Sequence, residues 1–292
     1  MQHVIPHFWF DTQAKEATEF YVTLFADSGV MSVTTISGTP SGDSDIVSFC
    51  LAGQEFMAIS AGPYFKLNPA ISMFVTFDTE AEIQEVWSKL VDGGTVMMAY
   101  DTYPWAQKYG WLQDKFGLSW QLSFSENHKT RQKITPMLMF TQGVSGKAKG
   151  ALELSFCTFP NSSVELMVPY TKDDGDTEGF IKHSRFTLNE SDFMAMDSSL
   201  DHKFTFNEAV SLIVNCQTQE EIDMYWEKLS AVPEAEQCGW LKDKFGVSWQ
   251  IVPTAMNEMM SSGDKDAIAR VTQAFLKMKK FDIATLKRAF EG

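Results

Sequence analysis

The pattern of apolar and polar residues near the start of the chain predicts one strand, one helix and three further strands. The apolar run from His7 to Phe10 has the length of a strand. The stretch 14–25 carries apolar residues three and four positions apart, which is typical of an amphipathic helix, and Asp11 or Thr12 is placed to cap it. Three β-rich segments separated by turn residues follow at 30–36, 46–51 and 55–60.

The same order of elements then recurs. A strand is predicted over 71–77, a helix over 81–90, a strand over 95–100 and two more strands between Gly110 and Phe124. This part of the chain therefore consists of two βαβββ modules in sequence. Two curved antiparallel sheets that meet in a cup, with helices on their convex sides, bury such a pattern economically, so we expect an α+β fold of paired βαβββ modules.

The chain also contains an internal repeat. Gly110–Gln121 is GWLQDKFGLSWQ and Gly239–Gln250 is GWLKDKFGVSWQ, with 10 of 12 positions identical at an offset of 129. The offset grows to 139 where Trp87 aligns with Trp226, so the copies differ by insertions. A period of about one domain indicates a tandem duplication of the whole unit.

A polar stretch separates the two copies. The segment from Glu126 to Lys133 is charged and lacks apolar periodicity, which is typical of a domain boundary. After Pro253 the pattern becomes helical, with Val271 and Phe275 in one apolar stripe. We expect a tail packed on the second copy, the alternative being a partner-binding helix. The predicted domains are 1–126, 134–255 and the helical tail 256–292.

Composition excludes several partner classes. The sequence has 24 basic and 38 acidic residues, a net charge of −14, which disfavours nucleic acid and anionic membrane surfaces. Its apolar runs are too short for a membrane span, and the start of the chain lacks a secretory pattern. Four widely spaced cysteines without a CxxC pair fit a reducing compartment. We therefore expect a soluble, cytoplasmic protein.

Several motifs together carry a family resemblance. PHFWFD with EFYVTLF, FMAISAGPYFKLNPAISMFV, and DKFG-x-SWQ in both copies resemble the PhnB-like family of the glyoxalase/bleomycin-resistance (vicinal oxygen chelate, VOC) superfamily. Its members are often labelled 3-demethylubiquinone-9 3-methyltransferase. The resemblance implies a cupped sheet in each copy, built by pairing that copy's own two modules, and a small-molecule site inside the cup. The fused copies would reproduce within one chain the homodimer of single-copy relatives, with further oligomerisation left open.

The resemblance also raises the question of a metal. Metalloenzymes of the superfamily bind a divalent ion through His, Glu or Gln on the first and last strands of the modules. Here Gln121 and Gln250 stand where those enzymes carry Glu, and Ser72 stands where an imidazole would be needed. His7 is near the ligand position of the first copy, but Met137 replaces it in the second. Each cup offers at most one good ligand, so we expect no metal and no cofactor.

Motifs for other chemistry are missing from the sequence. There is no GxSxG, HExxH or P-loop, and no glycine-rich loop suited to a methyl donor. Asp114 with Lys115, and Asp243 with Lys244, recur in both copies, and we interpret them as ion pairs that stabilise a turn.

Strand alternation suggests which side chains line the cups. Ser119 and Gln121 should face the first cup while Trp120 packs on helices, and Gln250 should face the second cup. Trp105 lies in an aromatic insertion, which we interpret either as a lid or as a loop that covers the boundary between the copies. The predicted ligand-binding residues are His7, Trp9, Phe49, Ser72, Trp105, Trp111, Ser119, Gln121 and Gln250.

Three functions remain open at this point. The first is a binding protein that holds a small apolar or aromatic molecule in a cup. The second is an enzyme: either a VOC metalloenzyme (lyase, isomerase or dioxygenase) with His7 and Gln121 as ligands, or a methyltransferase as the family label suggests. The third is an interaction protein whose cups are filled by their own side chains. One scaffold hosts many functions, so the fold does not choose among them.

Overall fold

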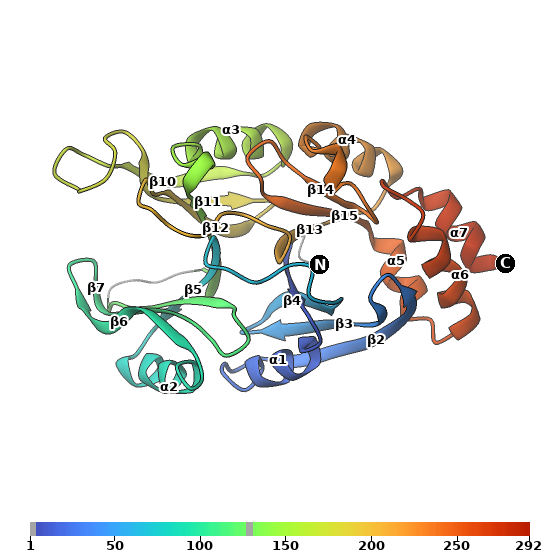
Figure 1. The fold of residues 1–292 in the computed structure, drawn as a ribbon, viewed down its shortest axis with the longest axis horizontal. Helices are drawn as coiled ribbons and strands as arrows, with labels where there is room; N and C mark the ends of the chain where they lie inside the picture. Colours follow the sequence, from blue (N-terminus) through green and yellow to red (C-terminus); the bar gives the residue numbers. More distant parts are fainter. Residues whose placement is uncertain (1–3, 127–130) are drawn as a thin grey trace.

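The computed structural model describes residues 4–126 and 131–292, and Figure 1 shows its arrangement. Residues 127–130 of the predicted domain boundary lie outside the described residues. In the described residues no helix is long and apolar enough to cross a membrane. The first copy contains β1 (Val4–Phe10), α1 (Ala14–Tyr21), β2 (Gly29–Thr39), β3 (Gly42–Leu51), β4 (Gln54–Ser60), β5 (Ile71–Phe77), α2 (Glu80–Leu90), β6 (Thr95–Tyr103), β7 (Ala106–Gln113) and β8 (Ser119–Phe124).

The second copy repeats this order up to its last module. Its elements are β9 (Ile134–Phe140), α3 (Ala148–Thr158), β10 (Ser163–Pro169), β11 (Ile181–Leu188), β12 (Ser191–Asp197), β13 (Val210–Cys216), α4 (Gln219–Leu229), β14 (Trp240–Lys242) and β15 (Ser248–Pro253). The prediction of four complete βαβββ modules is therefore wrong for the last one. Between α4 and β14 the chain has only a 3-10 turn over 233–235, because the segment is short and polar.

The strands form two mixed sheets, and each sheet takes one module from each copy. Sheet A has the order β14-β15-β13-β1-β4-β3-β2, and sheet B has the order β10-β11-β12-β9-β5-β8-β7-β6. The expectation that each copy pairs its own two modules is wrong: β1 pairs antiparallel with β13, and β5 with β9. The duplicated chain thus forms an intrachain pseudo-dimer with exchanged modules.

The two segments that cross between the sheets are hydrogen bonded to each other. Asn68, in the crossing from β4 to β5, donates from Nδ2 to the carbonyl oxygen of Thr205 at 3.0 Å. Asn207, in the crossing from β12 to β13, donates in the same way to the carbonyl oxygen of Lys66 at 2.9 Å. These reciprocal bonds satisfy backbone acceptors where the chain leaves one sheet for the other.

One main core lies on the helix side of both sheets. Trp120 is fully buried, with its ring 5.4 Å from that of Tyr21 and 6.2 Å from that of Phe25. Trp249 packs in the same way on Phe159, just after α3, at 5.1 Å. This confirms the prediction that the apolar face of the last strands packs against helices. In Figure 1, α1 and α2 lie on one side of the molecule and α3 and α4 on the other.

The DKFG-x-SW repeat has a structural explanation that differs from the prediction. Asp114 Oδ1 accepts the backbone N–H groups of Phe116 and Leu118, at 2.8 and 3.1 Å, and Oδ2 accepts the indole N–H of Trp120 at 2.8 Å. Lys115 does not pair with this carboxylate. Its Nζ lies 5.0 Å from the centre of the Phe116 ring instead. Asp243 makes the same three contacts in the second copy.

Helices α1 and α3 are capped from neighbouring strands. The predicted cap of α1 at Asp11 or Thr12 is wrong, because Ser60, at the end of β4, accepts the backbone N–H of Ala14 at 3.0 Å. Asp197, at the equivalent end of β12, accepts the N–H of Ala148 at 3.0 Å. A side-chain oxygen at a helix start satisfies donors that have no partner within the helix.

The tail forms α5 (Thr254–Met260), α6 (Lys265–Phe275) and α7 (Ile283–Glu291) at the end of the molecule beyond sheet A (Figure 1). The backbone N–H of Gly239, before β14, donates to the carbonyl oxygen of Lys279 at 2.7 Å. Gly239 has φ of 82°, and a Cβ there would lie 2.4 Å from the Phe281 ring, so glycine is needed. Because α6 also packs against β2, the tail contacts both copies.

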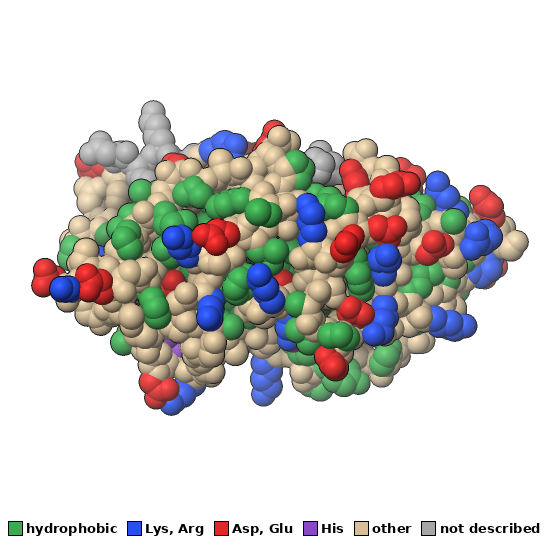
Figure 2. Space-filling model, turned by 90° about the horizontal axis from the view of Figure 1, so that it is seen from above, with side chains coloured by type: hydrophobic (Ala, Val, Ile, Leu, Met, Phe, Trp, Pro, Cys, Tyr) green, Lys and Arg blue, Asp and Glu red, His purple; other side chains and the backbone are tan. Residues whose placement is uncertain are grey.

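The surface carries both signs of charge. Figure 2 shows acidic and basic side chains interspersed on the face it views. Of the 11 ion pairs between described residues, most join partly exposed groups, as in Lys89 with Glu85 at 2.8 Å. Such pairs contribute little to stability.

Candidate functional site

Each sheet has a face turned away from the helices. We call these faces cup A, on sheet A, and cup B, on sheet B. Strand alternation assigns side chains to them. On β1, Phe8 is buried in the main core, so His7 and Trp9 point into cup A. On β8, Trp120 is in the main core, so Gln121 points into cup B.

His7 lies on the floor of cup A. Its side chain is 3% exposed, and Nδ1 is 3.5 Å from the hydroxyl oxygen of Ser211 on β13. Gln250 Nε2 donates to the same hydroxyl at 2.9 Å, and the Trp240 ring meets His7 edge-on at 5.5 Å. Burial lowers the pKa of His7 to about 3, so the imidazole is neutral at pH 7.

Aromatic side chains close the rim of cup A. The indole N–H of Trp9 donates to the carbonyl oxygen of Gly62 at 2.8 Å, and its ring lies 5.0 Å from Phe65 and 6.0 Å from Trp240. These contacts tie the end of β1 to the crossing segment and to β14. Trp9 therefore already has its partners within the chain.

The tail covers the β2 end of cup A. Ile36 and Ser44 pair across β2 and β3, and alternation turns both away from Val47. Ile36 nevertheless belongs to the main core, which also includes Val271 and Phe275 of the tail. Ile36 is 5% exposed and Ser44 is fully buried. Since α1 packs on the core side, we attribute this burial to α6, whose Gln273 Nε2 lies 3.2 Å from where a Cβ on Gly38 would be.

The floor of cup B is a buried chain of hydrogen bonds. The Tyr109 hydroxyl donates to Gln121 Oε1 at 2.8 Å, and Gln121 Nε2 donates to the Ser72 hydroxyl at 2.7 Å. Beside them the indole N–H of Trp111 donates to the Ser119 hydroxyl at 2.8 Å. Burial raises the pKa of Tyr109, so its phenol stays protonated near neutral pH. The floor is polar and carries no formal charge.

Apolar side chains surround this floor and form a cluster separate from the main core. Methionine and aromatic residues dominate it, and methionine adapts readily to the shape of a neighbour because its side chain is unbranched and flexible. The cluster contains Ala106, Tyr109, Trp111 and Met139, with Phe74, Met97, Met98, Tyr103, Met196 and Phe204 packed against it.

The hairpin between β6 and β7 carries one exposed aromatic ring, that of Trp105. Trp105 is 62% exposed and stacks on Tyr103 at 5.0 Å. It also meets Tyr109, a floor residue of cup B, edge-on at 6.0 Å. The hairpin tip is therefore continuous with the contents of cup B.

The structure divides the predicted site residues into three groups. Cup A contains His7, Trp9 and Gln250. Cup B contains Ser72, Trp105, Trp111, Ser119 and Gln121. The third group is Phe49 alone, which is fully buried in the main core and stacked on Phe56. His7 and Gln121, considered together as ligands of one ion, lie on different sheets. Register brings Ser211 and Gln250 to His7 instead, because modules are exchanged between the copies.

Sequence reasoning missed several residues of cup B. Tyr109, Met139 and Met196 are absent from the predicted ligand-binding residues, although all three line cup B. The alternation of Met137, Leu138 and Met139 along β9 could have revealed a methionine face, since Leu138 lies in the main core.

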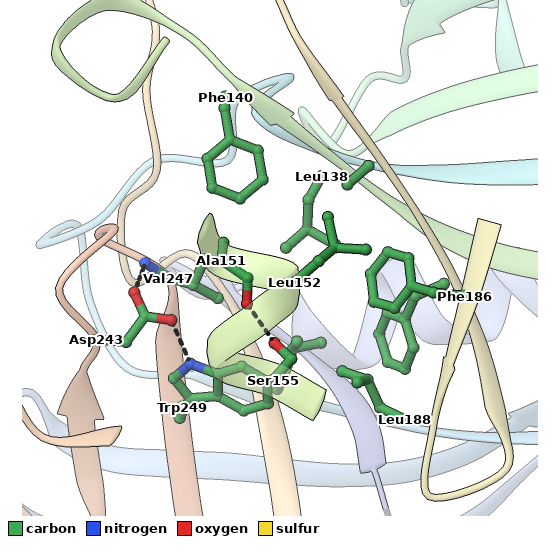
Figure 3. A pocket seen from close by; sticks show the side chains of 13 residues that line it. Leu138, Phe140, Ala151, Leu152, Ser155, Phe186, Leu188, Asp243, Val247 and Trp249 are labelled. Carbon is green, nitrogen blue, oxygen red and sulfur yellow. Dashed lines mark hydrogen bonds between the residues drawn. The ribbon is translucent and has the colours of Figure 1, made fainter. Parts of the chain in front are cut away.

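Figure 3 shows a small cavity on the helix side of the sheets. It lies among Phe140, Leu152, Phe186 and Trp249, with Asp243 hydrogen bonded to the Trp249 indole beside it. Its volume is about 20 Å³, room for about one water molecule. It is a packing gap in the core and is too small for a substrate.

The described residues do not fit a methyl donor. The turns from β1 to α1, from β5 to α2 and from β13 to α4 contain no glycine. The turn from β9 to α3 does contain Gly143 and Gly146, but Asp197 accepts the N–H of Ala148 at the start of the helix. That carboxylate would repel the carboxylate of an amino-acid-based donor.

The described residues fit a divalent metal poorly as well. In 4–126 and 131–292, no group of three or more His, Cys, Asp or Glu side chains lies together. Around His7 the neighbours are a hydroxyl and a neutral amide, and the amide N–H already donates to that hydroxyl. These are weak donors for a catalytic ion.

Known proteins resemble this chain in sequence and in architecture. The sequence profile of the 3-demethylubiquinone-9 3-methyltransferase family matches residues 2–123 and again 132–252. A PhnB protein of Bacillus cereus, described as a 3-demethylubiquinone-9 3-methyltransferase, is 36% identical over 42% of this chain and 100% of its own, with a TM-score of 0.40. Glyoxalase I of Zea mays is 9% identical over 90% of this chain and 98% of its own, with a TM-score of 0.57. No curated protein matches the chain.

The two matches of the family profile coincide with the two copies of the repeat, and the likeness to glyoxalase I extends over both copies in one fold. The chain therefore belongs to the 3-demethylubiquinone-9 3-methyltransferase (PhnB-like) family, as a tandem duplication, and it shares the fold of glyoxalase I.

Proposed function

We propose that this protein binds a small apolar or aromatic molecule in cup B without a metal ion. The observation that carries the proposal is the methionine and aromatic cluster of cup B, which is separate from the main core and surrounds a buried polar floor. An apolar lining with a few placed polar groups is typical of small-molecule sites.

The side chains of cup B pack against one another, so binding requires some of them to move. Met139 is 5% exposed, while Met196 is only partly buried. Both have flexible side chains that can turn aside at small cost. The Trp105 hairpin beside them supplies a surface that can follow the shape of the bound molecule.

Cup B is favoured over cup A because of the asymmetry between them. Cup A is covered at its β2 end by the tail, and its rim is closed by contacts of Trp9 with Phe65 and Trp240. At cup B, by contrast, the exposed Trp105 contacts the floor residue Tyr109. Four free thiols, Cys50, Cys157, Cys216 and Cys238, support the expected reducing, cytoplasmic setting.

A matched pair of variants tests the choice of cup. Met196 and Ile59 occupy equivalent positions on β12 and β4, on the cup faces of sheet B and sheet A. The neutral dye N-phenyl-1-naphthylamine, whose fluorescence rises in apolar sites, serves as the probe. Met196→Trp should abolish the rise by filling cup B, whereas Ile59→Trp should leave it.

Each outcome decides the proposal. Circular dichroism and thermal melting establish that both variants fold. Equal loss in both variants, or loss in Ile59→Trp alone, would place binding elsewhere and overturn the proposal. So would the absence of any fluorescence rise with the unaltered protein, which would favour a protein whose cups serve only packing.

The second candidate is a VOC metalloenzyme that acts in cup A, favoured by the contact of His7 with Ser211 beside Gln250. It is tested by the metal content of the purified protein and by melting after addition of zinc, nickel, manganese or ferrous ions. We expect no stoichiometric metal and no shift. A stoichiometric metal that is lost in His7→Ala would replace our proposal with this one.

A further inference from the structure

Arg185 lies at the side of cup B and takes no part in the network described above. It is on β11, where the adjacent Phe186 is 4% exposed and stacks on Phe193 in the main core. Alternation therefore turns Arg185 to the opposite face of the sheet, the face of cup B. The pairing register sets Leu166 on one side of it and Met194 on the other.

The guanidinium makes no direct contact with an acceptor among the described residues, although the carboxylates of Glu165 and Asp192 attract it from a distance. No hydrogen bond or ion pair joins Arg185 to any of them, although the side chain is half-buried. The nearby carboxylate of Asp192 is held by Arg131 at 2.5 Å, and Glu165 lies on the exposed edge strand β10. Burial lowers the pKa of Arg185, while both carboxylates oppose this effect. A partly desolvated cation without a hydrogen-bonding partner is costly, and a bound anion that accepts its hydrogen bonds would reduce that cost.

The surroundings of Arg185 are apolar and lead to the polar floor of the cup. Register places Arg185, Met194, Met137 and Ser72 side by side on four adjacent strands. Strands lie about 4.8 Å apart, so the row from Arg185 to Ser72 spans about 14 Å. This is the length of a molecule of two or three fused or linked rings with a polar group at each end. Met194 and Met137 are 2% and 4% exposed, so a ligand reaches this row only when the side chains that cover it move aside.

The edge strand extends the row outward. Leu166 and Val168 on β10 are 42% and 39% exposed, and they face Arg185 and His183 on β11. An exposed apolar patch beside a cation suits a ligand with an apolar body and an anionic end. Arginine is well shaped for this role because its planar guanidinium forms two parallel hydrogen bonds with a carboxylate.

We propose that Arg185 binds the carboxylate of an aromatic or apolar acid whose body lies on Met137 and Met194 in cup B. The inference rests on the proposed function and narrows its ligand class from apolar molecules in general to apolar carboxylates. In a chain with a net charge of −14, such a ligand needs a specific cation, because the overall field of the protein repels it.

The test compares an acid with its neutral amide. Binding of 2-naphthoate and of 2-naphthamide is measured by titration calorimetry at low ionic strength, with the unaltered protein and with Arg185→Gln, Arg185→Lys and Arg288→Gln. Arg288 is the matched control because it lies on α7 in the tail, where its side chain donates to Thr285 and attracts the carboxylate of Asp282. We expect 2-naphthoate to bind more tightly than the amide, and Arg185→Gln to weaken it by about tenfold or more.

The variants separate the role of Arg185 from the existence of the site in cup B. Arg185→Gln should leave amide binding nearly unchanged, Arg185→Lys should retain part of the preference for the acid, and Arg288→Gln should behave like the unaltered protein. If both compounds bind equally and Arg185→Gln affects neither, the role of Arg185 is overturned while the cup B site stands. If neither compound binds at millimolar concentration, both the inference and the proposed function fail.

Discussion

Asn68 and Asn207 occupy equivalent positions in the two crossing segments, and each donates a hydrogen bond to a backbone carbonyl of the other crossing, at 3.0 and 2.9 Å. Each side chain also accepts a backbone N–H two residues further on, from Ala70 at 2.8 Å and from Ala209 at 2.9 Å. The two asparagines thus fix both the turn in their own crossing and its contact with the other one. This reciprocal arrangement joins the two crossings beside the strand pairs β1–β13 and β5–β9, which also hold the exchanged modules together.

We predict that Asn68→Ala and Asn207→Ala each lower the free energy of unfolding by about 1–2 kcal/mol, since each leaves a backbone acceptor and a donor without a partner. The measurement is urea unfolding followed by circular dichroism. Asn257→Ala, at an exposed position of α5, is the matched control and should change little. Losses near zero in both crossing variants would mean that strand pairing alone fixes the exchange.

The buried carboxylate of the repeated motif gives a second prediction. Asp114→Ala removes the acceptor of two backbone N–H groups and the Trp120 indole, so we expect a loss of about 3–5 kcal/mol. Lys115→Ala should cost less than about 1 kcal/mol, because Lys115 does not pair with Asp114. Thermal and urea unfolding of both variants check this. A loss of more than about 1 kcal/mol in Lys115→Ala would restore the interpretation of the motif as an ion pair.

Much of the fold was predictable from the sequence. The strands, the helices, the duplication and the two faces of the last strand follow from periodicity, because burial of one face fixes which residues alternate. The exchange of modules was not predictable from this pattern. β1 buries the same side chains whether its antiparallel neighbour is β13 or β5, so hydrophobic pattern does not distinguish the two pairings. Polar contacts such as Asn68 with Thr205 distinguish them, and these leave no periodic signal.

The candidate site was predictable only in part, for a related reason. Alternation correctly turned Ser119, Gln121 and Gln250 away from the helices, but the assignment of each to the cup of its own copy is wrong, because Gln250 lies beside His7 and Gln121 lies on the other sheet. Phe49 lies on the opposite face, in the main core. Arg185 has no motif around it. Its candidacy depends on burial and on the lack of a hydrogen-bonding partner, which are properties of the folded chain.

The neutral His7 predicts a pH dependence of stability. Its pKa falls from an ordinary value of 6.5 to about 3 on folding, so the unfolded chain binds a proton below pH 6.5 that the folded protein does not bind. The contribution of neutral His7 to the free energy of unfolding is therefore fully present above pH 6.5 and is lost progressively as the pH falls toward 3. Between pH 7 and pH 5 the loss should be about 2 kcal/mol.

Urea unfolding at several pH values measures how steeply the free energy of unfolding falls with pH. His7→Leu should remove most of this dependence, whatever its effect on stability at pH 7. His202→Gln should remove less, because His202 is only partly buried and nearby Asp176 and Asp201 oppose the lowering of its pKa. An unchanged slope in His7→Leu would show that other groups govern acid unfolding.

The aromatic hairpin was interpreted either as a lid over cup B or as a loop that covers the boundary between the copies, and a variant of Trp105 distinguishes the two. Trp105 is 62% exposed and stacks on Tyr103, so Trp105→Ala should leave the melting temperature nearly unchanged. Tyr64, also 62% exposed, lies in the crossing from β4 to β5, and Tyr64→Ala serves as the matched control. If Trp105 closes over a bound molecule, its loss should speed dissociation of N-phenyl-1-naphthylamine several-fold in stopped-flow measurements, with little change in association. Identical dissociation rates in Trp105→Ala, Tyr64→Ala and the unaltered protein would exclude a lid, because a residue that covers the bound molecule must be displaced before the molecule leaves.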